Sequence, residues 1–330
     1  MFQKTAIKAL CLSVLCFGLL LGQEAFAAKK TVLKFSAGNS ATNPSVIALN
    51  EKFKPMLEEL TKGQVEVQIF DNSQLGGERD QMEQMQSGVL QMAYISPVLG
   101  SIYPKMNILD LPFLFRDEAH VDMVLDGPLG EEILKDLPSV GLIPLGYFEN
   151  GFRVTTTSKR AINSLEDMKG LKIRTPQAPL SVAIFNALGA NPTPMSFTEL
   201  YSALQQGVVD GQENSYNTWT SSRFFEVQKY VAETNHMWGS FAILASASWW
   251  KRLDQGTKDA IIKTCKETSK YQRQVFRSQT ADSKKMATDN GMQVTTPDLT
   301  GFRKALQPVY EDFYKQHPDY KELIQKILAL

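Results

Sequence analysis

The sequence predicts an α/β protein with two lobes, each containing a mainly parallel sheet that is covered by helices on both faces. Three observations support this prediction. Segments with strand and helix periodicity alternate over the first hundred residues, and the alternation starts again near residue 150. The roughly 300 residues after the first 27 also exceed what one hydrophobic core usually holds. Such alternation favours parallel strands, because a crossover helix returns the chain to the same edge of the sheet.

The first 27 residues have the composition of an export signal. Lys4 and Lys8 precede an apolar stretch from Ala9 to Leu21, and Ala25-Phe26-Ala27 fits a small-x-small cleavage site. The apolar stretch is shorter than the roughly 20 residues that span a bilayer, and a retained N-terminal anchor is the alternative interpretation. We therefore expect a soluble periplasmic protein that begins at Ala28.

Charge and composition argue against several classes of function. The chain has 35 basic and 35 acidic side chains, so neither nucleic acid nor an anionic membrane surface is an expected partner. Cys265 is the one cysteine beyond the export signal, so no intrachain disulfide is expected. The three histidines lack metal-ligand spacing, and no phosphate-binding, dinucleotide-binding or serine-nucleophile motif occurs. We expect no metal and no cofactor.

In the first lobe, short segments alternate between apolar and polar residues as strands do, and longer segments carry apolar residues at helical spacing. The predicted strands cover 31–37, 65–70, 90–95 and 142–147, and the predicted helices cover 43–61, 78–87 and 118–124. Gly88 follows the second helix, as a terminating glycine often does. A buried turn is expected at 110–115.

The pattern restarts after Asn150-Gly151, which we take as the boundary between the lobes. The predicted strands of the second lobe cover 153–157, 171–174 and 208–209, and its helices cover 178–188 and 197–206. A further strand at 241–247 is expected to return to the first lobe. These predictions assign 28–150 with about 240–280 to lobe I, and 151–239 with about 281–330 to lobe II.

A single long helix is predicted from Asp254 to Asn290, because this stretch contains no proline and one glycine, near its start. Its sparse apolar stripe suggests that it packs along both lobes. Gly291 ends it, and a strand at 292–295 and a helix at 299–314 complete the chain.

Arg174 and Asn214 are the first candidates for a binding site. Arg174 follows a short apolar strand, and its planar guanidinium can hold a carboxylate through two hydrogen bonds. Asn214 follows a helix and an Asp-Gly turn, and its amide could hold the same ligand. A surface ion pair for Arg174 and a turn-stabilising role for Asn214 are the alternatives.

Two further charged residues have open interpretations. Arg153 is either a second cationic contact or part of a salt bridge at the lobe boundary. Glu78 follows Gly76-Gly77 at the start of a helix, where glycines and the helix N-terminus could bind an anion. The alternative is a tight turn in which Glu78 favours the helix dipole.

Aromatic residues near the lobe crossings could form a stacking surface for a ligand ring. The candidates are Trp219, five residues after Asn214, Trp238, before the returning strand, and Tyr94, at a strand end. A position in the core is the alternative for each of them.

Five segments together resemble the periplasmic solute-binding subunits of TRAP (tripartite ATP-independent periplasmic) transporters of the DctP type. They are SQLGGERDQMEQMQSGVLQMAYIS at 73–96, LDLPFLF at 109–115, SLEDMKGLKIRTP at 164–176, NPTPMSFTELYSALQQGVVDGQEN at 191–214 and EVQKYVAETNH at 226–236. The resemblance covers essentially the whole mature chain in the order and spacing of that family.

This resemblance implies two lobes that close on a ligand in a central cleft, with the long helix spanning both. It implies that Arg174 binds the ligand carboxylate, that Asn214 is its companion donor and that Phe197 packs on the ligand. Glu78 matches a frequent acidic position, and Arg153 falls near a second, less uniform arginine. It also implies delivery of the ligand to a small and a large membrane subunit for uptake driven by an ion gradient. We expect the receptor itself to be a monomer.

Two positions depart from that family in ways that bear on the ligand. Ser215 stands where a proline is usual, and Ser96 stands where sialic-acid binders tend to carry an acidic residue. Sialate is therefore less favoured. The sequence leaves two main ligand classes, a uronate-like sugar acid or an aromatic monocarboxylate such as an indole or 2-oxo acid. The alternative function is a periplasmic enzyme acting on acidic sugars, for which Glu78 and Glu213 could be nominated as an acid–base pair.

Overall fold

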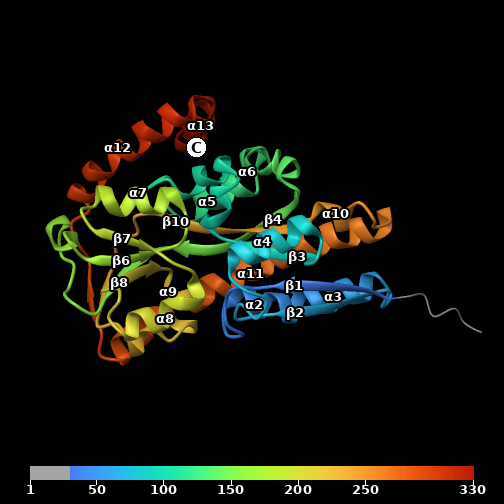
Figure 1. The fold of residues 1–330 in the computed structure, drawn as a ribbon, viewed down its shortest axis with the longest axis horizontal. Coiled ribbons are helices and arrows are strands. Elements are labelled where there is room, and N and C mark those ends of the chain that lie inside the picture. The colour runs from blue at the N-terminus through green and yellow to red at the C-terminus, as the bar shows by residue number, and fades with distance from the viewer. Residues whose placement is uncertain (1–29) are drawn as a thin grey trace, which may run out of the picture.

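The computed structural model describes residues 30–330 (Figure 1), so the predicted export signal and its cleavage site lie outside the described part of the chain. Two sheets organise these residues. The strand order is β2-β1-β3-β10-β4 in the first sheet and β11-β9-β5-β8-β6-β7 in the second. The two-lobed α/β fold predicted from the sequence is confirmed.

The first sheet contains four mutually parallel strands and one that opposes them. Its strands are β1 (Thr31–Ser36), β2 (Val65–Phe70), β3 (Met92–Ile95), β4 (Leu142–Phe152) and β10 (Trp238–Ser246). β1 pairs in parallel with β2 and β3, whereas β10 is antiparallel to both β3 and β4. The strand expected to return to the first lobe is therefore present as β10.

The second sheet repeats this arrangement with one opposed strand, β5. Its strands are β5 (Val154–Thr157), β6 (Lys172–Thr175), β7 (Asn191–Pro194), β8 (Gly211–Asn214), β9 (Tyr230–Ala232) and β11 (Gln293–Thr295). β5 is antiparallel to β8 and β9, while β6 pairs in parallel with β7 and β8. The strand predicted at 208–209 is wrong, because Val208 and Val209 form part of the turn before β8.

The opposed strand in each sheet results from how the chain crosses between the lobes. β4 ends at Phe152 and β5 begins at Val154, so the chain passes from one sheet to the other through Arg153 without reversing. Residues 233–237 make the return crossing from β9 to β10. The chain keeps its direction at each crossing. β4 therefore runs with the other parallel strands of the first sheet while β5 opposes the second sheet, and β9 runs with the second sheet while β10 opposes the first.

Helices cover the two sheets (Figure 1). They are α2 (Pro44–Ala48), a π-helical turn (Leu49–Phe53), α3 (Lys54–Leu60), α4 (Glu78–Ser87), α5 (Glu118–Leu125), α6 (Pro128–Leu134), α7 (Pro179–Ala187), α8 (Phe197–Gln205), α9 (Tyr216–Ser221) and α10 (Ala247–Trp250). The single helix predicted over 43–61 is thus interrupted by one wider turn. Gly88 ends α4 in the left-handed conformation with a φ of 81°, as predicted.

The long helix α11 (Gln255–Asp289) joins the lobes, packing on α2 and β4 on one side and on α9 on the other. α12 (Thr300–Gln316) follows and packs on α7. The last helix, α13 (Lys321–Ala329), reaches back toward α5, where the Ile327 carbonyl is 2.8 Å from His120 Nε2. The segment assigned to lobe II therefore also contacts lobe I (Figure 1). The exact lobe boundaries stay a prediction. Within residues 30–330, no helix combines the length and apolar character that a membrane crossing requires.

Candidate functional site

A cavity that is partly open to solvent lies between the lobes. Its walls come from residues at or just after the carboxyl ends of strands in both sheets. These include Asn39 after β1, Ser96 after β3, Arg174 near the end of β6, Ser196 after β7 and Asn214 at the end of β8. Such strand ends are the usual ligand position in open α/β sheets, because the loops there are free to vary.

The guanidinium of Arg174 faces this cavity, and some of its N–H groups have no hydrogen-bond partner in the described chain. The side chain is 4% exposed. Its Nε and Nη2 donate to the Met195 carbonyl at 3.2 and 2.9 Å, and its guanidinium carbon lies 5.6 Å from the Phe197 ring centroid. Nη1 has no hydrogen-bond partner among residues 30–330. Burial lowers the pKa of Arg174 to about 10, so the group stays positively charged at neutral pH.

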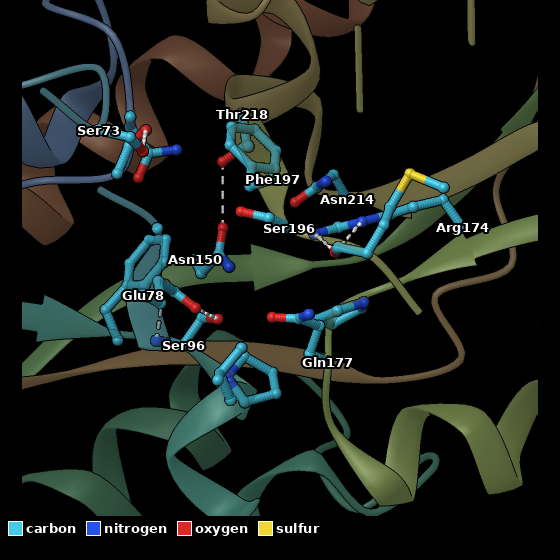
Figure 2. A pocket seen from close by; sticks show the side chains of 18 of the residues that line it. Ser73, Glu78, Ser96, Asn150, Arg174, Gln177, Ser196, Phe197, Asn214 and Thr218 are labelled. Carbon is cyan, nitrogen blue, oxygen red and sulfur yellow. Dashed lines mark hydrogen bonds between the residues drawn. The ribbon is translucent and has the colours of Figure 1, made fainter. Parts of the chain in front are cut away.

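The position of Arg174 follows from the pairing of β6 with β7. Arg174 is opposite Thr193 in that parallel register, so the chain leaving β7 places the Met195 carbonyl beside the guanidinium. The aromatic ring of Phe197, at the start of α8, then covers one face of the same group. The Met195 carbonyl and the Phe197 ring together hold the Arg174 guanidinium in place, and its unpaired N–H groups are directed into the cavity (Figure 2).

Arg153 also lines the cavity, with its Nε and Nη2 occupied and its buried Nη1 without a hydrogen-bond partner among the described residues. Its Nε donates to Glu213 Oε2, and its Nη2 donates to Glu213 Oε1 at 2.9 Å and to Asn214 Oδ1 at 3.0 Å. The register opposes Val154 and Asn214, so a side chain just before β5 reaches the end of β8. The salt bridge with Glu213 is present, and a second cationic contact through Nη1 stays a prediction.

Asn214 lines the cavity as well, with its amide shared among neighbours. Its oxygen accepts from Arg153, and its Nδ2 donates to Gln212 Oε1 at 2.8 Å. One N–H of the amide has no partner among the described residues and is available to a ligand.

Glu78 and Ser96 form a pair on the opposite wall from Arg174 (Figure 2). Ser96 Oγ donates to Glu78 Oε2 at 2.5 Å, and the Ser96 backbone N–H donates to Oε1 at 3.1 Å. Desolvation by the surrounding protein raises the pKa of Glu78, with the hydrogen bonds from Ser96 opposing that rise. The carboxyl of Glu78 retains lone pairs that can accept ligand hydroxyl groups.

The structure adds polar wall residues that the sequence did not single out. Thr218 Oγ1 donates to Asn150 Oδ1 at 3.1 Å, and both side chains face the cavity with Gln177 and Ser196 (Figure 2). In the sequence, Asn150 marks only the predicted boundary between the lobes. A polar residue at the end of the strand that crosses between lobes is the signal that could have identified it.

Three of the aromatic candidates lie outside the cavity wall. Trp219 packs against Tyr216 and Phe225, and Trp238 packs edge-to-face on Phe115, so both belong to the core. Tyr94 is fully buried, and its hydroxyl donates to Asn39 Oδ1 at 2.9 Å. Tyr94 therefore lies outside the cavity and holds the side chain of the wall residue Asn39 in place. Of the predicted aromatic contacts, Phe197 alone lines the cavity.

No group of three or more histidine, cysteine, aspartate or glutamate side chains is arranged to hold a metal ion within residues 30–330. The cavity offers instead a cation, a carboxyl group and several amides and hydroxyls from both lobes. This combination suits a small, hydroxylated anion.

Comparisons with known proteins agree with this description. Residues 35–317 match the DctP family, described as bacterial extracellular solute-binding protein, family 7. The chain is 34% identical over 301 residues to the 2,3-diketo-L-gulonate-binding periplasmic protein YiaO of Escherichia coli (strain K12), which covers 89% of this chain and 90% of that protein.

Two solved structures with the same fold carry sugar acids. A TRAP periplasmic solute-binding protein from Polaromonas sp. JS666 bound to D-erythronate has a TM-score of 0.88 at 35% identity, covering 91% of this chain and 99% of that one. One from Bradyrhizobium sp. BTAi1 in complex with D-galacturonate has a TM-score of 0.87 at 35% identity, covering 90% and 99%.

Proposed function

The chain belongs to family 7 of the bacterial extracellular solute-binding proteins, and we propose that its ligand is a sugar acid with one carboxylate. The observation that carries this proposal is the placement of Arg174 and Glu78 on opposite walls of one cavity. The ligand carboxylate binds the free donors of Arg174 and the free N–H of Asn214. Hydroxyl groups at the other end of the ligand donate to Glu78.

The charges of the cavity argue against a dicarboxylate. The charge of Arg153 is balanced by Glu213, so Arg174 is the cation without a carboxylate partner among the described wall residues. A second ligand carboxylate would face Glu78, and two carboxylates at close range repel each other. A single carboxylate with distal hydroxyls satisfies both walls.

The wall chemistry also favours a sugar acid over an aromatic acid. Trp219, Trp238 and Tyr94 are packed in the core, and Arg174 lies over one face of the Phe197 ring. Asn150, Thr218 and the other polar wall groups suit hydroxyls. The three relatives named above are associated with polyhydroxy or keto monocarboxylates, which supports the same class.

Binding of both lobes to one ligand couples occupancy to lobe closure. Two contacts already bridge the mouth of the cleft: Arg79 Nη2 donates to the Gln177 carbonyl at 3.3 Å, and Ser40 Oγ donates to the Ser221 carbonyl at 2.9 Å. A ligand that contacts both walls stabilises this closed arrangement by its greater affinity for it.

The place of the protein in transport is part of the proposal. The receptor is exported through the signal at residues 1–27, with cleavage near Ala27, and acts in the periplasm as a monomer. The closed, occupied receptor delivers its ligand to small and large membrane subunits of a TRAP transporter. Family membership and the composition of the N-terminal residues support this assignment.

The enzymatic alternative has no feature in its favour. Glu78 is held by Ser96, and Glu213 is paired with Arg153, so the two carboxylates nominated as an acid–base pair have other partners. The family is one of solute receptors.

A titration of the mature chain with matched acids tests the proposal. We expect D-galacturonate, D-glucuronate or an aldonate to raise the melting temperature by several degrees, because ligand at 100 times its Kd adds about 2.7 kcal/mol of stability. The uncharged sugars D-galactose and D-glucose, and the dicarboxylate galactarate, are the controls. Tighter binding of an indole acid or a dicarboxylate than of every sugar acid would contradict the proposed class.

A further inference from the structure

Asn43 is a buried polar residue between the lobes that does not line the ligand cavity. It caps the N-terminus of α2, where its Oδ1 accepts from the Ser45 backbone N–H at 2.9 Å. One side of its amide is therefore used within lobe I. The other side, Nδ2, is directed toward lobe II.

The Nδ2 group of Asn43 donates to two hydroxyl oxygens on α9, Thr218 Oγ1 at 3.4 Å and Ser221 Oγ at 3.3 Å. Thr218 in turn donates to Asn150 on the crossing strand and faces the cavity (Figure 2). Lobe I, lobe II and the cavity wall are thus joined by one continuous set of side-chain hydrogen bonds.

We infer that Asn43 is a positioning residue for ligand binding, which holds α9 and its cavity residue Thr218 against lobe I when the receptor is closed. Separation of the lobes must break both Asn43 contacts, because donor and acceptors belong to different lobes. The contacts therefore stabilise the closed state and slow ligand release, although Asn43 does not touch the ligand cavity. Ligand affinity depends on the stability of the binding-competent state, so it falls when these contacts are lost.

The inference rests on the proposed function, since its readout is the affinity for a sugar acid. Asn43→Ser is the decisive variant. Serine retains N-terminal capping of α2, but its side chain is too short to bridge to α9. Loss of these two long hydrogen bonds is expected to weaken binding about fivefold to tenfold.

The kinetics separate a closure contact from a general structural role. With D-galacturonate as the probe, stopped-flow fluorescence should show a faster dissociation rate for Asn43→Ser and a nearly unchanged association rate. The melting temperature of the ligand-free variant should stay close to that of the unmodified chain. Asp117→Ser is the matched control, because the side chain of Asp117 also caps a helix, α5, and lies outside the cavity wall. It should leave both rates unchanged.

A double-mutant cycle with Ser221→Ala tests the route of the effect. Ser221 is not a cavity residue, and its hydroxyl accepts from Asn43. If Asn43 acts through α9, the combined variant binds more tightly than the sum of the two single losses predicts. Unchanged dissociation in Asn43→Ser, or full additivity in the cycle, overturns the inference while the proposed function stands. An unmodified chain that binds no sugar acid overturns the proposed function and this inference together.

Discussion

At the residue scale, Arg174 combines burial with incomplete hydrogen bonding. Met195 and Phe197 hold the guanidinium in place, yet Nη1 lacks a protein partner in the described chain. A charged donor that is already desolvated and oriented in the protein loses little further conformational entropy when it binds a carboxylate. The strength of this site therefore depends on the shape of the guanidinium as well as its charge.

Replacing Arg174 should separate these two contributions. We expect Arg174→Ala to weaken sugar-acid binding about 30-fold or more, since loss of one partner of a desolvated pair costs roughly 2–5 kcal/mol. Arg174→Lys should also bind poorly, because an ammonium group cannot reproduce the planar fork. Calorimetry measures both. Arg160→Lys is the control, since Arg160 also donates to backbone carbonyls but lies away from the cavity. Equal affinities for Arg174→Lys and the unmodified chain would contradict the bidentate contact.

Burial of the His236 side chain makes the stability of the folded chain depend on pH. The imidazole is fully buried, with Nδ1 2.8 Å from Thr234 Oγ1 and Nε2 4.0 Å from Glu213 Oε2. Burial lowers the pKa of His236 to about 4, against the opposing effect of Glu213. Between pH 6.5 and 4 the unfolded chain therefore takes up a proton that the folded chain does not, and the folded state loses stability.

We expect the free energy of unfolding of the unmodified chain to fall by up to about 3 kcal/mol, relative to His236→Gln, as the pH drops from 7 to 4. Urea denaturation at several pH values measures this difference, which isolates the imidazole from the carboxyl groups common to both proteins. His317→Gln, at the end of α12, is the control. Parallel pH profiles for His236→Gln and the unmodified chain would show that the buried imidazole takes up a proton without unfolding.

At the element scale, the long helix α11 is fitted closely to the crossing strand β4. Gly151 in β4 has a φ of 79°, and a Cβ atom at this position would lie 2.5 Å from Cζ of Phe276 in α11. Further along, Gln272 exchanges hydrogen bonds with both the N–H and the carbonyl of Glu149, at 2.8 Å each. The helix thus satisfies backbone groups at the free edge of β4, where a neighbouring strand would otherwise pair.

Gly151→Ala should therefore destabilise the fold in two ways, through strain in the left-handed backbone and through a clash of the new Cβ with Phe276. Gly63 provides the comparison, because its φ is 74° and an added Cβ would meet no atom within 4 Å. We expect Gly63→Ala to cost about 1–2 kcal/mol, from backbone strain alone, and Gly151→Ala about 1–3 kcal/mol more, from the clash with Phe276. Chemical denaturation measures both, and Phe276→Leu should recover part of the second loss. Equal costs for the two glycine variants would mean that α11 shifts freely on β4.

Periodicity in the sequence predicted the elements that are long or strongly patterned. It predicted α11 because 35 residues without proline leave few alternatives, and it missed α9 because six residues are too few to show a helical period. β7 was missed because Asn-Pro-Thr-Pro does not look like a strand, although proline is tolerated there because β7 is an edge strand.

Prediction of the site was limited by contacts between distant residues. Arg174 and Glu78 were identifiable, since each stands at the end of a strand or the start of a helix. The pairing of Arg153 with Glu213, 60 residues later, depends on the β5–β8 register, which local patterns do not specify. The same limit applies to Trp219 and Trp238, because a tryptophan near a crossing can turn toward the cavity or the core with the same sequence around it.

At the scale of the whole molecule, four segments connect the lobes within residues 30–330: the β4–β5 crossing, the β9–β10 crossing, α11, and the C-terminal segment in which α12 packs on α7 and α13 contacts α5. The two crossings are single stretches of extended chain beside the cavity, whereas α11 contacts both lobes along its length (Figure 1). Contacts at the cleft mouth, such as Arg79 with Gln177 and Ser40 with Ser221, have no covalent support and form only when the lobes meet. Closure should therefore be reversible and controlled by the ligand.

Small-angle X-ray scattering of the mature chain measures this directly. The lobes share a buried apolar cluster formed by α5, α7 and α12, so opening should occur at the cleft mouth, and we expect the ligand-free chain to have a larger radius of gyration than the closed structure. Saturating sugar acid should reduce it, because a ligand that binds both walls favours the closed state by its difference in affinity for the two states. Arg174→Ala at the same ligand concentration should remain expanded, which ties compaction to occupancy of the cavity. If the unmodified chain were equally compact with and without a ligand that calorimetry shows to be bound, closure could not be the signal that a membrane partner reads.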